Sequence, residues 1–108
     1  MRFHYSSEEI GKAVHQQDGP YTELLRHETL HGGIYVLHAG EADLQQPHAE
    51  DEVYYILGGT AQMTVDQEQF SVGTGDLIYV PAHIEHRFFN IERDLQVLIF
   101  FSRAPIGQ

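Results

Sequence analysis

At 108 residues the chain is long enough for one domain with a single core, residues 1–108, and too short for two. Its 6 lysines and arginines against 16 aspartates and glutamates give a formal charge of −10. This charge argues against nucleic acid and anionic membranes as partners, because both are bound by clustered cations. The chain has no cysteine, so any metal must be held by imidazole, carboxylate, amide or water.

The N-terminal sequence MRFHYSSEEIGKAV has no apolar segment after a basic start. No window in the chain approaches the roughly 18 apolar residues of a membrane span. We therefore expect a cytoplasmic protein without a membrane partner.

The first predicted element in chain order is a short helix over residues 6–17. Ser6 and Glu9 have the spacing of a capping box, in which each side chain bonds the backbone N–H of the other residue. Apolar residues follow with helical period, and the sequence DGP at residues 18–20 then ends the helix. No further helix is predicted.

From residue 21 onward the sequence is typical of an all-β fold. Short runs rich in β-branched and aromatic residues are separated by turn sequences such as GG, DQE, GTG, PAH and ERD, which predicts a sandwich or barrel. In TAQMTVD apolar and polar residues alternate, so one face is expected in the core and the other in solvent. The predicted strands span residues 21–28, 33–39, 52–57, 60–66, 68–72, 76–80, 86–91 and 95–102.

The last apolar run, LQVLIFF at residues 95–101, has no polar face. Such a strand is either covered on both sides or lies at a subunit interface. A small barrel must also cover its edge strands. We therefore expect a homodimer.

Potential metal ligands stand in two glycine-led segments, GEADLQQPHAEDEVYYILGG at residues 40–59 and GDLIYVPAHIEHRFFN at residues 75–90. A buried carboxylate or imidazole is costly unless it is paired or coordinated. Two histidines and one carboxylate on facing strands, here His48, His86 and Glu52, form a facial arrangement that holds Fe(II) and leaves open positions. One metal would account for all three residues.

Strand alternation places side chains two residues apart on one face. Each polar residue is therefore expected at the rim of an otherwise apolar row. The face-sharing sets are Gln46 with His48, Glu52 with Tyr54 and Ile56, and His86 with Phe88 and Asn90.

These two segments resemble the two motifs of the cupin superfamily. The pattern G-x5-H-x-H-x3,4-E-x6-G is matched by Gly40, Gln46, His48, Glu52 and Gly59, and the pattern G-x5-P-x-G-x2-H-x3-N by Gly75, Pro81, His83, His86 and Asn90. The resemblance covers residues 33–102 and implies a double-stranded β-helix, a small jelly-roll barrel, with a divalent metal (Fe, Mn, Ni, Zn or Cu) in its mouth. Carried over by position, it implies the ligands His48, Glu52 and His86, with Gln46 in the place of the family's first histidine.

Two positions depart from the family pattern. Gln46 offers only an amide oxygen, a weaker ligand than imidazole, so the fourth ligand is Gln46, a water or the substrate. His83 stands where the family has glycine, but histidine tolerates left-handed backbone better than most residues, so the turn is expected to survive. The His83 imidazole then overhangs the pocket as an acid/base candidate. Tyr54, on the face of Glu52, is the other catalytic candidate, with a plain core role as its alternative.

The remaining polar residues have ordinary interpretations. Five histidines are expected on the surface or hydrogen-bonded in the core: His4, His15, His27, His31 and His38. Glu50 and Asp51 are expected in a solvated acidic turn.

The sequence leaves two functions open. The first is a metal-dependent enzyme acting on a small organic substrate, because the cupins that this chain resembles include quercetinase-type dioxygenases, sugar and uronate isomerases, decarboxylases and polyketide cyclases. The second is a non-catalytic module that binds a metal or a small ligand. Fold alone does not choose between them. A regulator would usually carry a helix-turn-helix region, for which the barrel leaves no room, and this favours an enzyme or a partner-dependent subunit.

Overall fold

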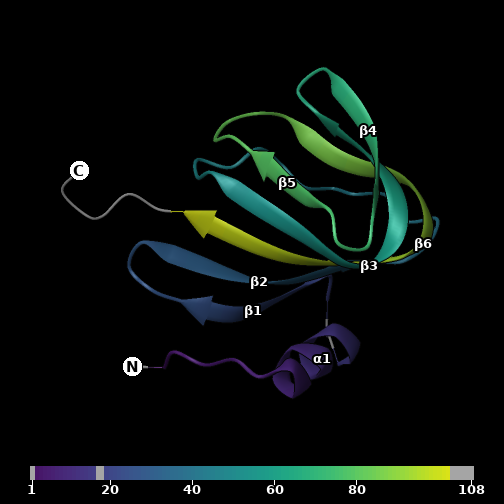
Figure 1. Cartoon of the computed structure of the whole chain (residues 1–108). Coiled ribbons are helices and arrows are strands. Elements are labelled where there is room, and N and C mark those ends of the chain that lie inside the picture. Colours follow the sequence, from purple (N-terminus) through teal and green to yellow (C-terminus); the bar gives the residue numbers. More distant parts are fainter. Residues whose placement is uncertain (1, 17–18, 103–108) are drawn as a thin grey trace.

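In residues 2–16 and 19–102, which are the residues described, the computed structural model contains one helix and six strands (Figure 1). The strands form one continuous hydrogen-bonded sheet with the order β1-β2-β6-β3-β4. The strand β5 lies off this path and pairs with residues 52–55 of β3, on the edge opposite β6. The predicted all-β fold with a short N-terminal helix is confirmed. The elements are α1 Ser7–His15, β1 Tyr21–Arg26, β2 Leu30–Leu37, β3 Glu52–Val65, β4 Glu68–Gly73, β5 Leu77–Val80 and β6 His86–Ser102.

The long strands β3 and β6 pair along their length and bend from one layer of the barrel into the other. In the first layer, residues 52–56 pair with residues 97–101, and β5, β2 and β1 extend this half of the sheet. In the second layer, residues 60–65 pair with residues 86–93, and β4 adds to it. The core lies between the two layers.

The sequence predicted that strands end at GG, residues 58–59, and at ERD, residues 92–94. Both predictions are wrong, because β3 and β6 each continue through these residues. Bulges replace the breaks, with register shifts on β3 between Ile56 and Gln62. Gly59 has φ +95°, and a Cβ there would lie 2.3 Å from the carbonyl oxygen of Asp94. Glycine is therefore required where the two bending strands approach each other.

A second bulge changes the predicted face of Asn90. His86 and Phe88 are buried on one face as expected, but Asn90 is exposed and the next residue, Ile91, is buried instead. Asn90 has φ 47°, a left-handed conformation, and this extra residue reverses the alternation of β6. The prediction that Asn90 shares the face of His86 is therefore wrong.

The helix begins where the sequence predicts. Ser6 is the N-cap, and its Oγ accepts the backbone N–H of Glu9 at 3.2 Å. The Glu9 carboxylate does not complete the box, since it pairs with the guanidinium of Arg2. α1 contacts β2 and β1 on the outside of the barrel (Figure 1). Residue 17, the last in the predicted helix, lies outside the described residues.

The core alternation predicted for TAQMTVD is confirmed. Ala61 and Met63 are buried and Val65 packs against them, whereas Gln62 and Thr64 are half-exposed. Across the described ranges, no helix has the length and apolarity needed to cross a bilayer. The expected cytoplasmic location stays a prediction.

Candidate metal centre

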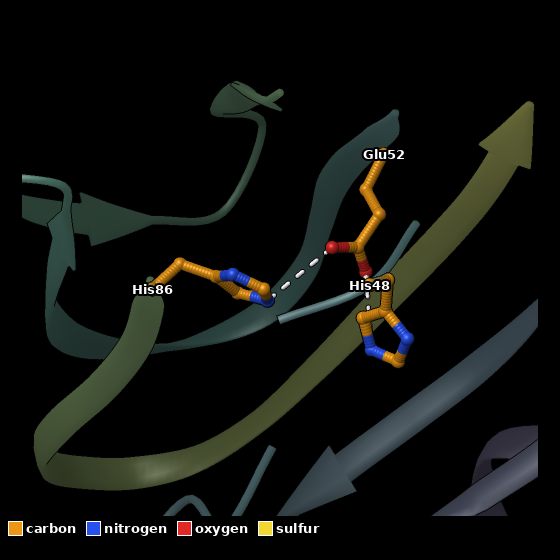
Figure 2. Close-up of side chains that lie close together, drawn as sticks. All are labelled: His48, Glu52 and His86. Atoms are coloured by element: carbon orange, nitrogen blue, oxygen red, sulfur yellow. Dashed lines mark ion pairs between the residues drawn. The ribbon is translucent and has the colours of Figure 1, made fainter. Parts of the chain in front are cut away.

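The fold brings His48, Glu52 and His86 together at one end of the barrel (Figure 2). His48 lies in the loop before β3, Glu52 is the first residue of β3, and His86 is the first residue of β6. Each offers a ligand atom, and these atoms all lie within 4.8 Å of one another. Figure 2 shows the two imidazoles approaching the Glu52 carboxylate from different sides. This group could hold a metal ion.

The hydrogen bonds of His86 leave one nitrogen available to a metal. Its Nδ1 lies 2.8 Å from the carbonyl oxygen of Ile84, so Nδ1 carries the proton and Nε2 keeps its lone pair. Nε2 is buried, has no hydrogen-bond partner among the described residues, and lies 3.3 Å from Glu52 Oε2. The backbone thus selects the tautomer that a metal ligand requires.

Glu52 is arranged in the same way. Its Oε1 accepts a hydrogen bond from the Tyr54 hydroxyl at 3.0 Å, while its Oε2 is buried without a partner in the described part of the chain. Burial raises the pKa of the Glu52 carboxyl above its ordinary value of 4.5, although His86 and Tyr54 oppose this shift. Two buried polar atoms, Glu52 Oε2 and His86 Nε2, therefore face each other unsatisfied. A divalent cation between them would satisfy both, so the residues fit a metal.

The raised pKa of Glu52 predicts how the metal-free protein responds to pH. The folded state holds the Glu52 proton more tightly than the unfolded state, so the stability that Glu52 contributes is fully present below pH 4.5 and is lost as pH rises through its folded pKa. Glu52→Gln removes this titration. We expect metal-free Glu52→Gln to melt higher than metal-free wild type at pH 7.5, with the difference shrinking as pH falls toward 4.5. Melting curves with chelator present measure it, and an equal difference at both pH values would contradict the assignment.

His48 is held by its surroundings rather than by a strand. Its carbonyl oxygen accepts the backbone N–H of His83 at 2.7 Å, and its ring meets the ring of Phe101 edge-on with centroids 5.3 Å apart. Residues 41–48 form no strand, so the alternation argument that paired Gln46 with His48 does not apply. Gln46 is exposed on this loop. Its role as a ligand stays a prediction.

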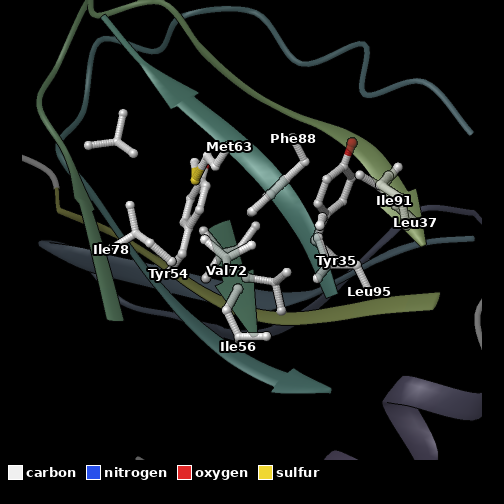
Figure 3. Packing of buried hydrophobic residues seen from close by; sticks show 14 of the residues in the cluster. Tyr35, Leu37, Tyr54, Ile56, Met63, Val72, Ile78, Phe88, Ile91 and Leu95 are labelled. Atoms are coloured by element: carbon white, nitrogen blue, oxygen red, sulfur yellow. The ribbon is translucent and has the colours of Figure 1, made fainter. Parts of the chain in front are cut away.

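The two catalytic candidates occupy different environments. His83 has φ 65°, the left-handed conformation expected for the turn, and its imidazole is exposed while its backbone supports His48. Tyr54 is fully buried, and Figure 3 shows it among the core side chains. Burial and the neighbouring Glu52 charge raise the pKa of the Tyr54 phenol above its ordinary value of 10.0. Tyr54 is therefore a neutral hydrogen-bond donor that orients Glu52.

A pocket of about 320 Å³ opens beside His48, within the size range of small-molecule sites. One side is formed by the loop between β2 and β3, residues 38–51, which we call the ligand loop. Its lining residues include Gln45, Gln46 and Glu50. The other side comes from β1, β2 and β6. Its lining residues from these strands are Tyr21, Arg26, His31, Tyr35, Ile99 and Phe101.

Several residues near the site were not singled out from the sequence. Asp43 accepts the Tyr35 hydroxyl at 2.8 Å and the backbone N–H of Phe88 at 2.9 Å, which ties the ligand loop to β6. Glu50, expected in a solvated turn, is mostly buried and pairs with His31. Asp43 is 8 residues from Tyr35 and 45 residues from Phe88 in the chain. Glu50 is 19 residues from His31. No local pattern marks them, because strand register brings them together.

Comparisons with known proteins bear on the family and the fold of this chain. A family model described as "Cupin domain" matches residues 26–101. An uncharacterized protein of Streptomyces coelicolor is 46% identical over 85 residues, which cover 79% of this chain and 81% of the relative.

Among solved structures, an RmlC-like cupin family protein of Methanocaldococcus jannaschii with a double-stranded β-helix fold superposes with a TM-score of 0.70 at 22% identity, covering 83% of this chain and 87% of that protein. The DMSP lyase DddQ of Ruegeria pomeroyi superposes with a TM-score of 0.67 at 20% identity, covering 76% of this chain and 42% of the lyase. Likeness at these identities shows the fold, which is the double-stranded β-helix that the sequence predicted. Because the family model matches most of its length, this chain belongs to the cupin family.

Proposed function

We propose that this cupin is a metal-dependent enzyme that acts on a small organic substrate at a mononuclear site in the barrel mouth. The observation that carries the proposal is the pair of buried atoms without hydrogen-bond partners among the described residues, Glu52 Oε2 and His86 Nε2. His48, the third residue of the group, lines the pocket. A purely structural core would not leave these atoms without partners. His48, Glu52 and His86 would hold the metal, with Gln46 as a weaker fourth ligand.

The residues around the site have separate tasks. A bound divalent metal would supply Lewis-acid polarisation of a substrate oxygen or, as iron or copper, redox chemistry with O₂. Tyr54 keeps the Glu52 carboxylate in one orientation, and the Ile84 carbonyl does the same for the His86 ring. With Glu52 ionised and both histidines neutral, the ligands carry one negative charge, so a divalent site keeps a net positive charge that suits an anionic substrate oxygen.

The second candidate function is a non-catalytic module that binds a metal or a small ligand. The position of His48 favours the enzyme, since its side chain is 36% exposed and lies in the pocket wall, where a ligand in the pocket can reach the metal. A closed structural site would bury all of its ligands. Turnover separates the two functions.

The test of the proposal begins with metal analysis of protein purified without added metal. Oxygen consumption with a panel of catechols and flavonols then identifies a dioxygenase, and product analysis of hydroxy acids and sugars identifies a lyase or isomerase. Stoichiometric metal without turnover of any compound favours the binding module. A Gln46→Ala variant in the same assays tests the fourth ligand, since loss of a weak oxygen donor should lower turnover more than metal affinity.

We also propose that the protein is a homodimer through the outer face of its first layer. LQVLIFF alternates between buried and half-buried residues, so its second face is the outside of the barrel. On that face Tyr55 and Leu77 are cross-strand partners, as are Tyr55 and Leu98. Leu77 is 70% exposed and nearby Tyr79 is 59% exposed. This apolar patch carries no charge on a chain of net charge −10, so two copies can meet there with little repulsion.

Leu77→Glu is expected to convert the dimer to a monomer, because a dimer with twofold symmetry would bury the new carboxylate twice in an apolar contact. Sedimentation velocity at micromolar concentration measures the change. Leu44→Glu is the matched control, since Leu44 is even more exposed, at 81%, but lies on the loop outside the patch. Monomeric wild type, or equal loss of dimer in both variants, would contradict the interface.

A further inference from the structure

Three residues paired across neighbouring strands connect the pocket with the metal centre. His31 of β2 pairs with Phe101 of β6, and Phe101 pairs in turn with Glu52 of β3. All three side chains are buried, with 9%, 7% and 1% of their surfaces exposed. Directly paired residues have neighbouring side chains on the same face of the sheet. His31 is therefore separated from the proposed ligand Glu52 by a single aromatic ring.

His31 reaches the other side of the centre through two contacts. Its ring stacks on Phe101 with centroids 4.7 Å apart and an interplanar angle of 13°, and the same Phe101 ring meets the His48 ring edge-on. Its Nε2 donates to Glu50 Oε2 at 2.5 Å, since an ionised carboxylate only accepts. Glu50 lies two residues after His48 and two before Glu52, so this bond restrains the segment that carries both ligands.

Fold stability does not explain a histidine at this position. Its Nδ1 is buried and has no hydrogen-bond partner within the described ranges. A buried nitrogen without a partner costs free energy, which a phenylalanine of similar shape would avoid while keeping the stack on Phe101. Among the contacts that the described residues make with His31, the bond to Glu50 is one that a phenylalanine could not make.

We propose that His31 is a positioning residue for the metal centre, which holds the His48–Glu52 segment in its ligating geometry through Glu50 and Phe101. This inference rests on the proposed metal site and adds a residue that neither cupin motif contains. Groups that hydrogen-bond directly to a metal ligand typically change metal affinity about 10- to 100-fold. His31 acts one residue further out, through Glu50, so we expect the lower end of this range, about 10-fold.

The experiment compares metal affinity with the stability of the metal-free protein. His31→Phe keeps the stack and removes the hydrogen bond, whereas His31→Gln keeps a donor of similar reach and removes the stack. We expect His31→Phe to weaken Co²⁺ and Zn²⁺ binding about 10-fold in a chelator competition and to alter the visible spectrum of bound Co²⁺. Its metal-free melting temperature should change little, because the loss of the bond to Glu50 is offset by the removal of the unsatisfied Nδ1. His31→Gln should lose less affinity than His31→Phe, because it keeps the bond to Glu50 and loses only the stack on Phe101.

His38→Phe is the matched control, because His38 follows the same strand and pairs with Asp94 at 3.1 Å on the surface. Equal affinity in His31→Phe and wild type, or an equal loss in His38→Phe, would overturn the inference. Should His31→Phe not fold, Glu50→Ala removes the same bond from the loop side, and unchanged affinity there overturns it as well. Wild type and His86→Ala are titrated first, so a wild-type protein that binds no metal is recognised as failure of the metal site itself.

Discussion

His86→Ala is expected to lose stoichiometric metal and to remain a folded barrel. The variant removes a buried nitrogen whose lone pair is available because the Ile84 carbonyl holds the proton on Nδ1. Losing a direct ligand should cost more affinity than the roughly 10- to 100-fold of an outer hydrogen-bond partner. The fold should persist because His86 is not part of the hydrophobic core, which includes Met63 and Val97.

Elemental analysis and melting curves measure these two effects separately. His83→Asn is the control, since asparagine tolerates the left-handed backbone at this turn and the backbone N–H to His48 remains. Only the imidazole of His83 is lost, so we expect full metal content and, if that ring is an acid/base group, reduced turnover. Stoichiometric metal in His86→Ala would remove His86 from the site.

Asp43→Ala is expected to lower the free energy of unfolding by about 3 kcal/mol and to loosen the ligand loop. The Asp43 carboxylate accepts from the Tyr35 hydroxyl, from the backbone N–H of Gln45 at 3.1 Å, and from the backbone N–H of Phe88. Hydrogen bonds to a charged group are worth more than neutral ones. Removing the carboxylate leaves the buried Phe88 N–H without its acceptor.

Urea unfolding of the metal-free protein measures this loss, and limited proteolysis tests whether residues 39–51 become accessible. Asp76→Ala provides a comparison, because Asp76 accepts one backbone N–H, that of Gly73 at 2.9 Å, in an exposed turn. We expect a much smaller loss there. Equal losses in the two variants would show that Asp43 is an ordinary turn residue and not the tie between loop and barrel.

Local features of the chain were predicted well. The Ser6 cap, the alternation of Ala61 and Met63, and the turn at His83 each depend on residues a few positions apart, whose geometry the backbone largely determines. The spacing of His48, Glu52 and His86 in two motifs likewise led to three side chains that the fold brings together. The predictions for strand ends and for Asn90 failed, since bulges form where two bending strands must stay paired and a single sequence does not mark them.

The sequence by itself determined the helix and the all-β fold, because capping and periodicity are properties of neighbouring residues. The three proposed ligands followed from the resemblance of two segments to the family motifs. Only the tertiary structure decided which groups surround those ligands. The register of β2 on β6 and of β6 on β3 placed His31, Phe101 and Glu52 in one row, and the path of the loop placed Glu50 against His31 and Asp43 against Phe88. Register is set by packing between distant segments, and a shift of one residue turns every side chain to the other face.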